Sequence, residues 1–198
     1  MRQASILIGI GAAVILLGLW MINRNFTIKS DTENITSSET SMPETMQLTS
    51  SAFEHTTSIP SRFTCDSRNV SPPLTWGDPP EGTRSFALIM DDPDVPKERH
   101  PEGVFNHWVL FNIPPGTNEI QPGETVGTPG ANGAGKNQYA GPCPPPQYEP
   151  SEHRYFFRLY ALDTMLDIPE GANKQQVLAA MEGRILAQAE LMGKYKRP

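Results

Sequence analysis

Two stretches of the sequence each place a stiff, turn-forming loop before a histidine that opens an apolar strand. In the first, the acidic turn 90–96 (MDDPDVP) precedes His107, and in the second, the loop 141–146 (GPCPPP) precedes His153. Both histidines could therefore converge at one end of a sheet. Two imidazoles and backbone N–H groups would hold a phosphate-like anion there, while Asp92 would orient an imidazole or accept from an ammonium group.

The same residue types also allow catalytic interpretations. Asp92, His107 and His153 resemble a two-histidine, one-carboxylate metal set, or an acid–base pair for hydrolysis. A covalent mechanism would need a nucleophile, and Cys143 is the candidate that the sequence offers beside these motifs. The run 130–137 is close to a phosphate-binding loop, but asparagine follows its lysine and no helix is expected after it. A binding pocket is therefore favoured over an enzyme, and a plain loop over a nucleotide site.

Short β-like runs must position these residues, and each is rich in aromatic or branched side chains and bounded by Pro, Gly or Asp. One stretch predicts a helix, with Asn173 as its N-cap and apolar side chains on one face. Segment 189–197 could continue this helix or turn into a last strand at Gly193. Many short strands predict a mainly β fold, an antiparallel β-sandwich with one or two peripheral helices. The expected strands are 74–76, 85–90, 107–113 and 155–162, and the expected helical face is Val177, Leu178, Met181, Ile185 and Leu186.

Composition and charge narrow the class of protein. The chain has 198 residues, a net charge of −6 and no block of like charges, which argues against a nucleic-acid partner. Its 20 prolines and 16 glycines favour turns and loops over helical bundles. Cys65 and Cys143 are too few for a disulfide framework, so a single bridge and a free thiol both stay open. The other two histidines, His55 and His100, are expected to be surface residues.

The N-terminal segment differs from the rest of the chain. Residues 4–22 form an uncharged apolar run, close to the ~20 residues that a helix needs to cross a bilayer. We therefore expect a transmembrane signal anchor over 1–23, with a cleaved signal peptide as the alternative. The Ser- and Thr-rich segment 24–46 should be a flexible stalk, and 47–198 the folded domain. This organisation predicts a membrane-anchored protein whose domain is extracytoplasmic.

Seven motifs follow one another in an order that is typical of one known family. They are SPPLTW (71–76), PEGTRSFALIMDDPD (80–94), HW (107–108), GPCPP (141–145), HRY (153–155), YALD (160–163) and AMEG (180–183). Over roughly residues 47–197 the chain resembles the phosphatidylethanolamine-binding proteins, in their bacterial and archaeal branch of Raf-kinase-inhibitor-like members. Several motifs in the right order make the resemblance specific.

The resemblance implies a β-sandwich with a small anion pocket at one end and a cis peptide near Asp92–Pro93. The implied function is binding of a small phosphate- or phosphoethanolamine-like anion, or of a phospholipid head group, with no metal or cofactor. Inhibition of a protease or kinase is the alternative, and a hydrolase using Asp92, His107 and His153 is a weaker one. No protein partner can be named from the sequence. The residues carried over to the pocket are Asp92, His107, Gly141, Pro142, His153 and Tyr155.

Overall fold

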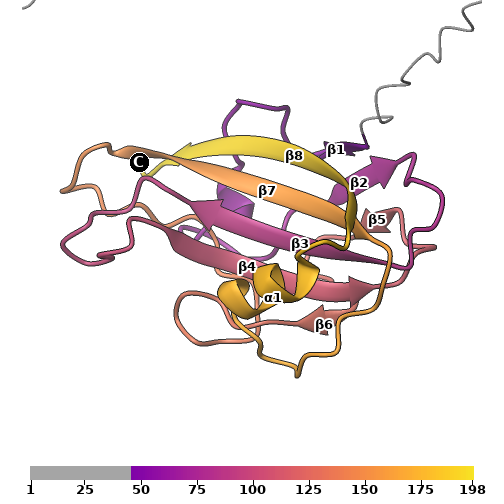
Figure 1. The fold of residues 1–198 in the computed structure, drawn as a ribbon. Helices are drawn as coiled ribbons and strands as arrows, with labels where there is room; N and C mark the ends of the chain where they lie inside the picture. Colours follow the sequence, from indigo (N-terminus) through magenta and orange to yellow (C-terminus); the bar gives the residue numbers. More distant parts are fainter. Residues whose placement is uncertain (1–45) are drawn as a thin grey trace, which may run out of the picture. The chain divides into compact units, whose positions relative to one another are not determined.

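Residues 46–198 are described by the computed structural model, and they form two antiparallel sheets (Figure 1). The larger sheet has the strand order β6-β4-β3-β7-β8, and the smaller has the order β1-β2-β5. The mainly β sandwich that the sequence predicts is therefore confirmed. The larger sheet contains β3 (Ser85–Asp92), β4 (Phe105–Ile113), β6 (Thr128–Pro129), β7 (Glu152–Leu162) and β8 (Ile185–Lys196), and the smaller contains β1 (Gln47–Thr49), β2 (Leu74–Gly77) and β5 (Glu119–Ile120).

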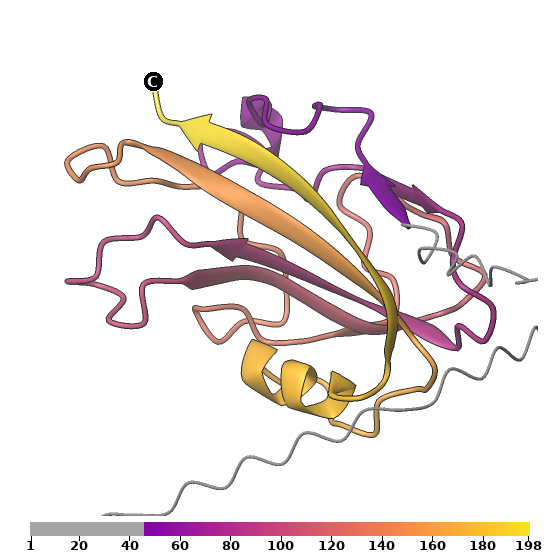
Figure 2. The same ribbon diagram turned by 45° about the horizontal axis from the view of Figure 1, so that its top comes forward.

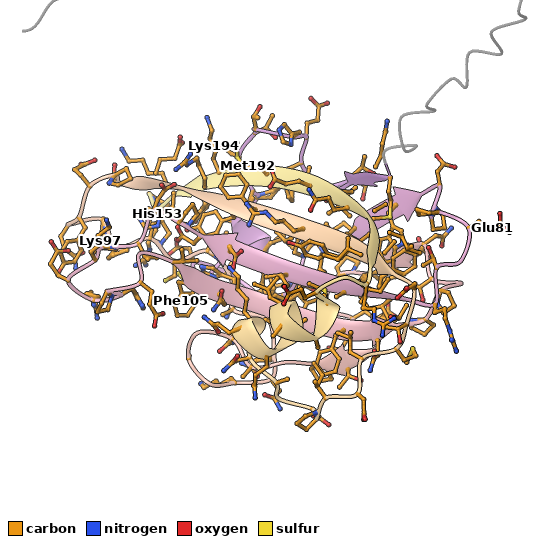
Figure 3. The ribbon with its side chains drawn as sticks, in the orientation of Figure 1. Glu81, Lys97, Phe105, His153, Met192 and Lys194 are labelled. Atoms are coloured by element: carbon orange, nitrogen blue, oxygen red, sulfur yellow. A yellow bond between two sulfur atoms is a disulfide. The ribbon has the colours of Figure 1, made fainter. Side chains whose placement is uncertain are left out.

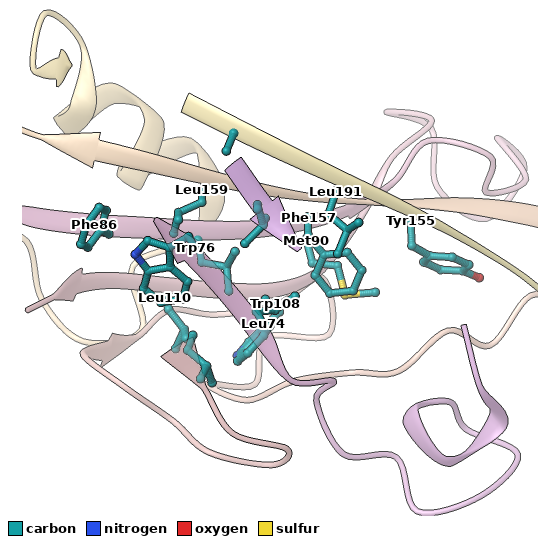
Figure 4. Packing of buried hydrophobic residues seen from close by; sticks show 14 of the residues in the cluster. Leu74, Trp76, Phe86, Met90, Trp108, Leu110, Tyr155, Phe157, Leu159 and Leu191 are labelled. Atoms are coloured by element: carbon teal, nitrogen blue, oxygen red, sulfur yellow. The ribbon is translucent and has the colours of Figure 1, made fainter. Parts of the chain in front are cut away.

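Alternate side chains of β3 and β7 fill the space between the two sheets (Figure 4). On β3 these are Phe86, Leu88 and Met90, all fully buried, and β7 contributes every second residue from Tyr155 to Ala161. Trp76 of β2 meets Phe86 edge-on, with ring centroids 5.6 Å apart. Each large apolar side chain buried in this way contributes roughly 1.5–3 kcal/mol. The inter-sheet cluster is therefore the main support of the strand ends that carry the site.

The opposite face of the larger sheet carries a second core beneath helix α1 (Lys174–Met181), which lies across that face in Figures 1 and 2. Ala87 and Ile89 of β3 and Val177 of α1 belong to it. Strand β3 is therefore buried on both faces, which explains its unbroken apolar sequence. Asp91, at the end of this face, accepts from Lys174 Nζ at 2.7 Å and so ties the helix to the sheet. A short 3-10 helix (Ser61–Phe63) lies between β1 and β2.

Helix α1 begins where the sequence predicts. Asn173 Oδ1 accepts the Gln176 N–H at 3.0 Å, and the Asn173 N–H donates to Gln176 Oε1 at 2.9 Å. These reciprocal bonds form a capping box, which satisfies two donors at the helix start. Asn173 is therefore confirmed as the N-cap.

The predicted helical face is wrong in its second half. The helix ends at Met181, because Gly183 has φ +70°, a left-handed conformation that a helix cannot contain. Ile185 and Leu186 then begin β8, where both are exposed. The other option, a last strand at Gly193, falls within the observed β8. The helix predicted from the sequence is too long because β8 begins soon after α1 ends. Only three residues separate the two elements, and β8 continues the apolar pattern of α1.

The localisation predicted from the sequence also requires correction. Among residues 46–198 no helix is long and apolar enough to cross a membrane, and α1 has 8 residues. This finding contradicts the prediction of a membrane-anchored, extracytoplasmic domain. The segment assigned to the anchor, 1–23, and nearly all of the segment assigned to the stalk, 24–46, lie outside the described residues.

Candidate functional site

The ends of three neighbouring strands bring the predicted site residues together. Asp92 ends β3, His107 lies near the start of β4, and His153 lies near the start of β7. In Figure 3, His153 and Phe105 lie at this end of the sheet, and Glu81 lies at the opposite end. The side chains of Asp92, His107 and His153 line a cavity of about 550 Å³. This volume is within the range of sites for small molecules.

His153 and Asp92 form the most buried part of the cavity. Alternation along β7 puts His153 on the same face as Tyr155 and Phe157. His153 Nδ1 lies 2.7 Å from Asp92 Oδ2, and the two side chains are 1% and 3% exposed. A carboxylate accepts hydrogen bonds, so Nδ1 carries the proton and donates it. His153 Nε2 is buried and has no hydrogen-bond partner among the described residues.

An irregularity in β4 turns His107 toward the same face. The pairing of β3 with β4 passes from Met90–Trp108 to Asp91–Asn106, so His107 is an extra residue in β4. Strict alternation would put His107 and Trp108 on opposite faces of the sheet. The shift in register, which has the form of a β-bulge, lets both point to the inter-sheet side.

His107 completes the polar floor of the cavity. Its Nδ1 lies 2.6 Å from the Ala140 carbonyl oxygen, which can only accept, so Nδ1 is the donor. Its Nε2 lies 3.8 Å from Asp92 Oδ2, is buried, and has no hydrogen-bond partner in the part of the chain that the structure describes. We call Asp92, His107 and His153 the floor. In both histidines Nδ1 donates to a protein oxygen, and Nε2 has no hydrogen-bond partner among the described residues.

The floor carries a carboxylate that stays ionised. Burial raises the pKa of Asp92, but the neighbouring imidazoles of His107 and His153 and the Asp94 N–H, which donates to Oδ1 at 2.8 Å, hold that pKa below its usual value. With neutral imidazoles the floor is anionic, and both Nε2 atoms are acceptors. With protonated imidazoles both Nε2 atoms become charged donors. Protonation therefore converts the floor from an acceptor of hydrogen bonds into a binder of anions.

An ion pair holds the acidic turn against β7. Asp94 Oδ1 accepts from Arg154 Nη2 at 2.7 Å, and its Oδ2 accepts from Arg154 Nε at 2.8 Å and from the Arg154 backbone N–H at 2.9 Å. The Arg154 hydrogen bonds hold the pKa of Asp94 below its usual range. Because Arg154 follows His153 and Asp94 lies two residues after Asp92, this pair fixes the two halves of the floor to each other.

The loop 141–145 forms one wall of the cavity. The Gly141 N–H donates to Asn69 Oδ1 at 2.8 Å. A Cβ atom at position 141 would collide with Asn69 Oδ1 and lie 2.7 Å from the Phe63 carbonyl oxygen, so the close approach requires glycine. Because its N–H is already used and Pro142 has none, this pair does not offer the backbone donors that the sequence led us to expect.

A disulfide joins this wall to the segment before β2. The structure links Cys65 to Cys143, with their Cα atoms 5.4 Å apart, and both residues line the cavity. The Cys65 N–H also donates to the Pro142 carbonyl oxygen at 3.1 Å. The wall is therefore fixed by one covalent bond and one backbone hydrogen bond.

Two predicted pocket residues lie behind the cavity surface. Tyr155 is fully buried, and its ring packs edge-on against His107, with centroids 5.2 Å apart. Burial and the charge of Asp92 raise the pKa of Tyr155, so its hydroxyl stays protonated. Pro142 is buried behind the wall. The predicted residues that line the cavity are Asp92, His107, Gly141 and His153.

Sequence reasoning missed the rim of the cavity. The β3–β4 connection contributes Val95, Pro96, Arg99 and His100 to the lining. His100, expected at the surface, is half-buried and packs against Phe105 with ring centroids 5.2 Å apart. A pocket at the ends of β3 and β4 must border their connection, so this loop could have been foreseen as a wall. No local pattern in the sequence indicates which of its side chains point inward. The other histidine expected at the surface, His55, is exposed.

Two further expectations concern metal and backbone geometry. Among residues 46–198, no group of three or more His, Cys, Asp or Glu side chains is arranged to hold a metal ion. The cis peptide implied near Asp92–Pro93 is not found there, and the structure has a cis X-Pro bond at Glu149–Pro150.

Comparison with known proteins agrees with the sandwich fold. Residues 49–196 match the family model of the phosphatidylethanolamine-binding proteins. A UPF0098 protein from Methanothermobacter thermautotrophicus is 47% identical over 161 residues, covering 77% of this chain and 99% of that protein. One from Chlamydia muridarum is 44% identical over 153 residues, with the same coverage.

Two crystal structures have the same fold. A phosphatidylethanolamine-binding protein homologue from Chlamydia trachomatis superposes with a TM-score of 0.74 at 41% identity, covering 78% of this chain and 99% of its own. Escherichia coli YbcL superposes with a TM-score of 0.67 at 28% identity, covering 77% and 99%. The fold and the pocket define a ligand-binding β-sandwich. The chain belongs to the phosphatidylethanolamine-binding protein family, in the branch that contains bacterial and archaeal members, and this membership supports a small-ligand-binding protein.

Proposed function

We propose that this protein binds a small phosphate-like anion in the cavity, through His107 Nε2 and His153 Nε2. The observation that carries the proposal is that both atoms are buried and lack a hydrogen-bond partner within residues 46–198. A buried polar atom without a partner costs free energy, so a site that leaves two of them on residues lining a cavity favours a ligand that satisfies both. A phosphate, a phosphoethanolamine or a phospholipid head group has this chemistry.

Proton uptake should accompany binding. An anion beside Asp92 is repelled unless the imidazoles are charged, and only protonated imidazoles can donate through Nε2 while Nδ1 is also donating. Asp92 then stabilises the imidazolium at 2.7 Å from His153 Nδ1. Affinity is therefore greatest at low pH and falls as the pH rises and the imidazoles lose their protons.

A binding role is favoured over hydrolysis. The candidate nucleophile, Cys143, is joined to Cys65, so its thiol is not free to attack a substrate. Metal-assisted hydrolysis lacks a set of ligands in the described part of the chain. Regulation of a partner protein would follow from ligand binding, and the site itself does not define that partner.

Calorimetric titration of the full chain with sulfate at pH 5.5 and pH 8 tests the proposal, because sulfate keeps its charge over this range. We expect tighter binding at pH 5.5, and 10- to 150-fold weaker binding for His107→Ala or His153→Ala, since a hydrogen bond to a charged group is worth about 1.5–3 kcal/mol. His55→Ala, which removes an exposed histidine, should bind like the wild type. Equal affinity at both pH values would contradict the proposal. The same titration with phosphoethanolamine and with phosphate then shows which class of ligand binds more tightly.

A further inference from the structure

The floor occupies the inner end of a cavity that is much larger than one anion. The cavity measures about 550 Å³, whereas a water molecule takes about 30 Å³ of liquid volume and a phosphate has five heavy atoms. The floor side chains are at most 6% exposed, so they lie at the closed end. A ligand that reaches the open end must therefore extend well beyond its anionic group.

The open end carries an arginine that has no carboxylate partner. Arg99, on the loop between β3 and β4, lines the cavity and is exposed. Within residues 46–198, no acidic side chain forms an ion pair with it. Of the other arginines in this range, Arg154, Arg158, Arg184 and Arg197 each pair with a carboxylate, whereas Arg62, Arg68 and Arg84 do not. Arg99 therefore presents an unneutralised guanidinium to the mouth of the cavity, in a chain whose net charge is −6.

Five further side chains that line the cavity are apolar. They belong to the β3–β4 connection, to the start of β4 and to the proline-rich loop before β7, and they offer no charged group to a ligand. These residues are Val95, Pro96, Phe105, Pro144 and Pro145. In Figure 3, Phe105 lies at the floor end of the sheet, and Lys97 marks the β3–β4 connection that extends past it.

We propose that the ligand of this pocket carries two anionic groups, one held by the floor and a second, beyond a short apolar spacer, held by Arg99. This rests on the proposed function of the floor and names the class of ligand more narrowly. A guanidinium presents paired N–H groups that match a carboxylate or a phosphate. An ω-carboxyalkyl phosphate is the simplest molecule with this pattern of anion, spacer and anion.

The two ends of the ligand should differ in pH dependence. A guanidinium keeps its charge over the whole pH range of the titrations, whereas anion binding by the floor needs protonated imidazoles. The contribution of Arg99 should therefore persist at pH 8, while the contribution of the floor weakens. A preference that vanished at pH 8 would assign the second anion to His100 instead.

The test compares alkyl phosphates with ω-carboxyalkyl phosphates of the same chain length, with one to four methylenes, by calorimetric titration of the full chain at pH 5.5. We expect the carboxylated member to bind about twofold to fivefold more tightly at one spacer length, as for a partly exposed ion pair. Arg99→Ala should abolish this preference, and it should weaken the binding of ethyl phosphate much less than that of the carboxylated phosphate. Arg99→Lys, which keeps the charge, should retain part of it.

Lys97→Ala is the matched control, because Lys97 is an exposed cation on the same loop that does not line the cavity. The Lys97→Ala variant should keep the full preference for the carboxylated phosphate over the alkyl phosphate. If ethyl phosphate binds but no carboxylated phosphate binds more tightly, the inference about Arg99 is wrong and the proposed function stands. If none of the phosphates binds, the proposed function itself is overturned, and the inference falls with it.

Discussion

His153 Nδ1 lies 2.7 Å from Asp92 Oδ2, and neither side chain is more than 3% exposed. This contact determines which nitrogen of His153 carries the proton, and it leaves Nε2 as the nitrogen without a hydrogen-bond partner within residues 46–198. The Ala140 carbonyl oxygen does the same for His107 at 2.6 Å. The chemical character of the pocket therefore depends on groups behind the imidazoles, and not on the imidazoles alone.

Asp92→Asn should change the pH range of binding more than the fold. Asparagine has a similar shape, so the turn should form, but it lacks the negative charge that stabilises a neighbouring imidazolium. We expect the pH at which sulfate affinity falls to move downward, and circular dichroism to remain like that of the wild type. An unchanged pH profile of sulfate affinity would show that Asp92 does not control the protonation of the floor.

Arg154→Ala should lower stability at neutral pH and have a smaller effect in acid. Because the pKa of Asp94 is lowered in the folded state, its ion pair contributes stability that is present above the ordinary pKa of about 3.9 and is lost as the pH falls through the lowered value. Since Arg154 is half exposed, we expect a loss of about 1 kcal/mol at pH 7, measured by urea denaturation.

Arg184→Ala is the control for this measurement. Arg184 lies 3.8 Å from Asp163 and is 56% exposed, so its removal should change the free energy of unfolding by less than that of Arg154. Equal losses in the two variants, or a loss for Arg154→Ala that stays constant down to pH 2, would argue against a specific role for the Asp94–Arg154 pair.

Reducing the disulfide should destabilise the domain and loosen the cavity wall. Cys65 and Cys143 are separated by 78 positions, and closing a loop of that length lowers the entropy of the unfolded chain by an amount worth about 4.5 kcal/mol at most. We expect a lower midpoint of urea denaturation in dithiothreitol, and the same midpoint for Cys65→Ser/Cys143→Ser with or without it. Two reactive thiols in the unreduced, denatured protein would show that the bridge does not form.

The orientation of His153 follows from local sequence more directly than that of His107. Alternation along HRYFFRLYAL places His153, Tyr155 and Phe157 on one face, and they share a face in the structure. The same rule puts His107 opposite Trp108, and it fails because the register of β3 with β4 omits His107. Local sequence carries no clear signal for such a bulge, since it depends on how two strands pair.

The extent of α1 and the rim of the cavity were harder to predict for related reasons. The apolar residues Ile185 and Leu186 fit a helical pattern, but pairing with β7 makes them part of a strand. The inward position of Arg99 depends on the path of the connection between β3 and β4, and its sequence does not fix that path. Both the end of α1 and the position of Arg99 depend on how distant parts of the chain are arranged. The N-cap at Asn173 depends on local sequence and was predicted correctly.

Nitrogen-15 NMR of histidine-labelled full chain tests the central claim most directly, because it shows which ring nitrogen of each histidine carries a proton. Without ligand at pH 8, His107 and His153 should be neutral and protonated at Nδ1. Sulfate added at pH 5.5 should leave both Nδ1–H groups in place and protonate both Nε2 atoms, with no such change at His55. Two results would contradict the two-imidazole anion site. One is sulfate binding that leaves both Nε2 signals unchanged, and the other is a ligand-free state at pH 8 in which Nε2 carries the proton in place of Nδ1.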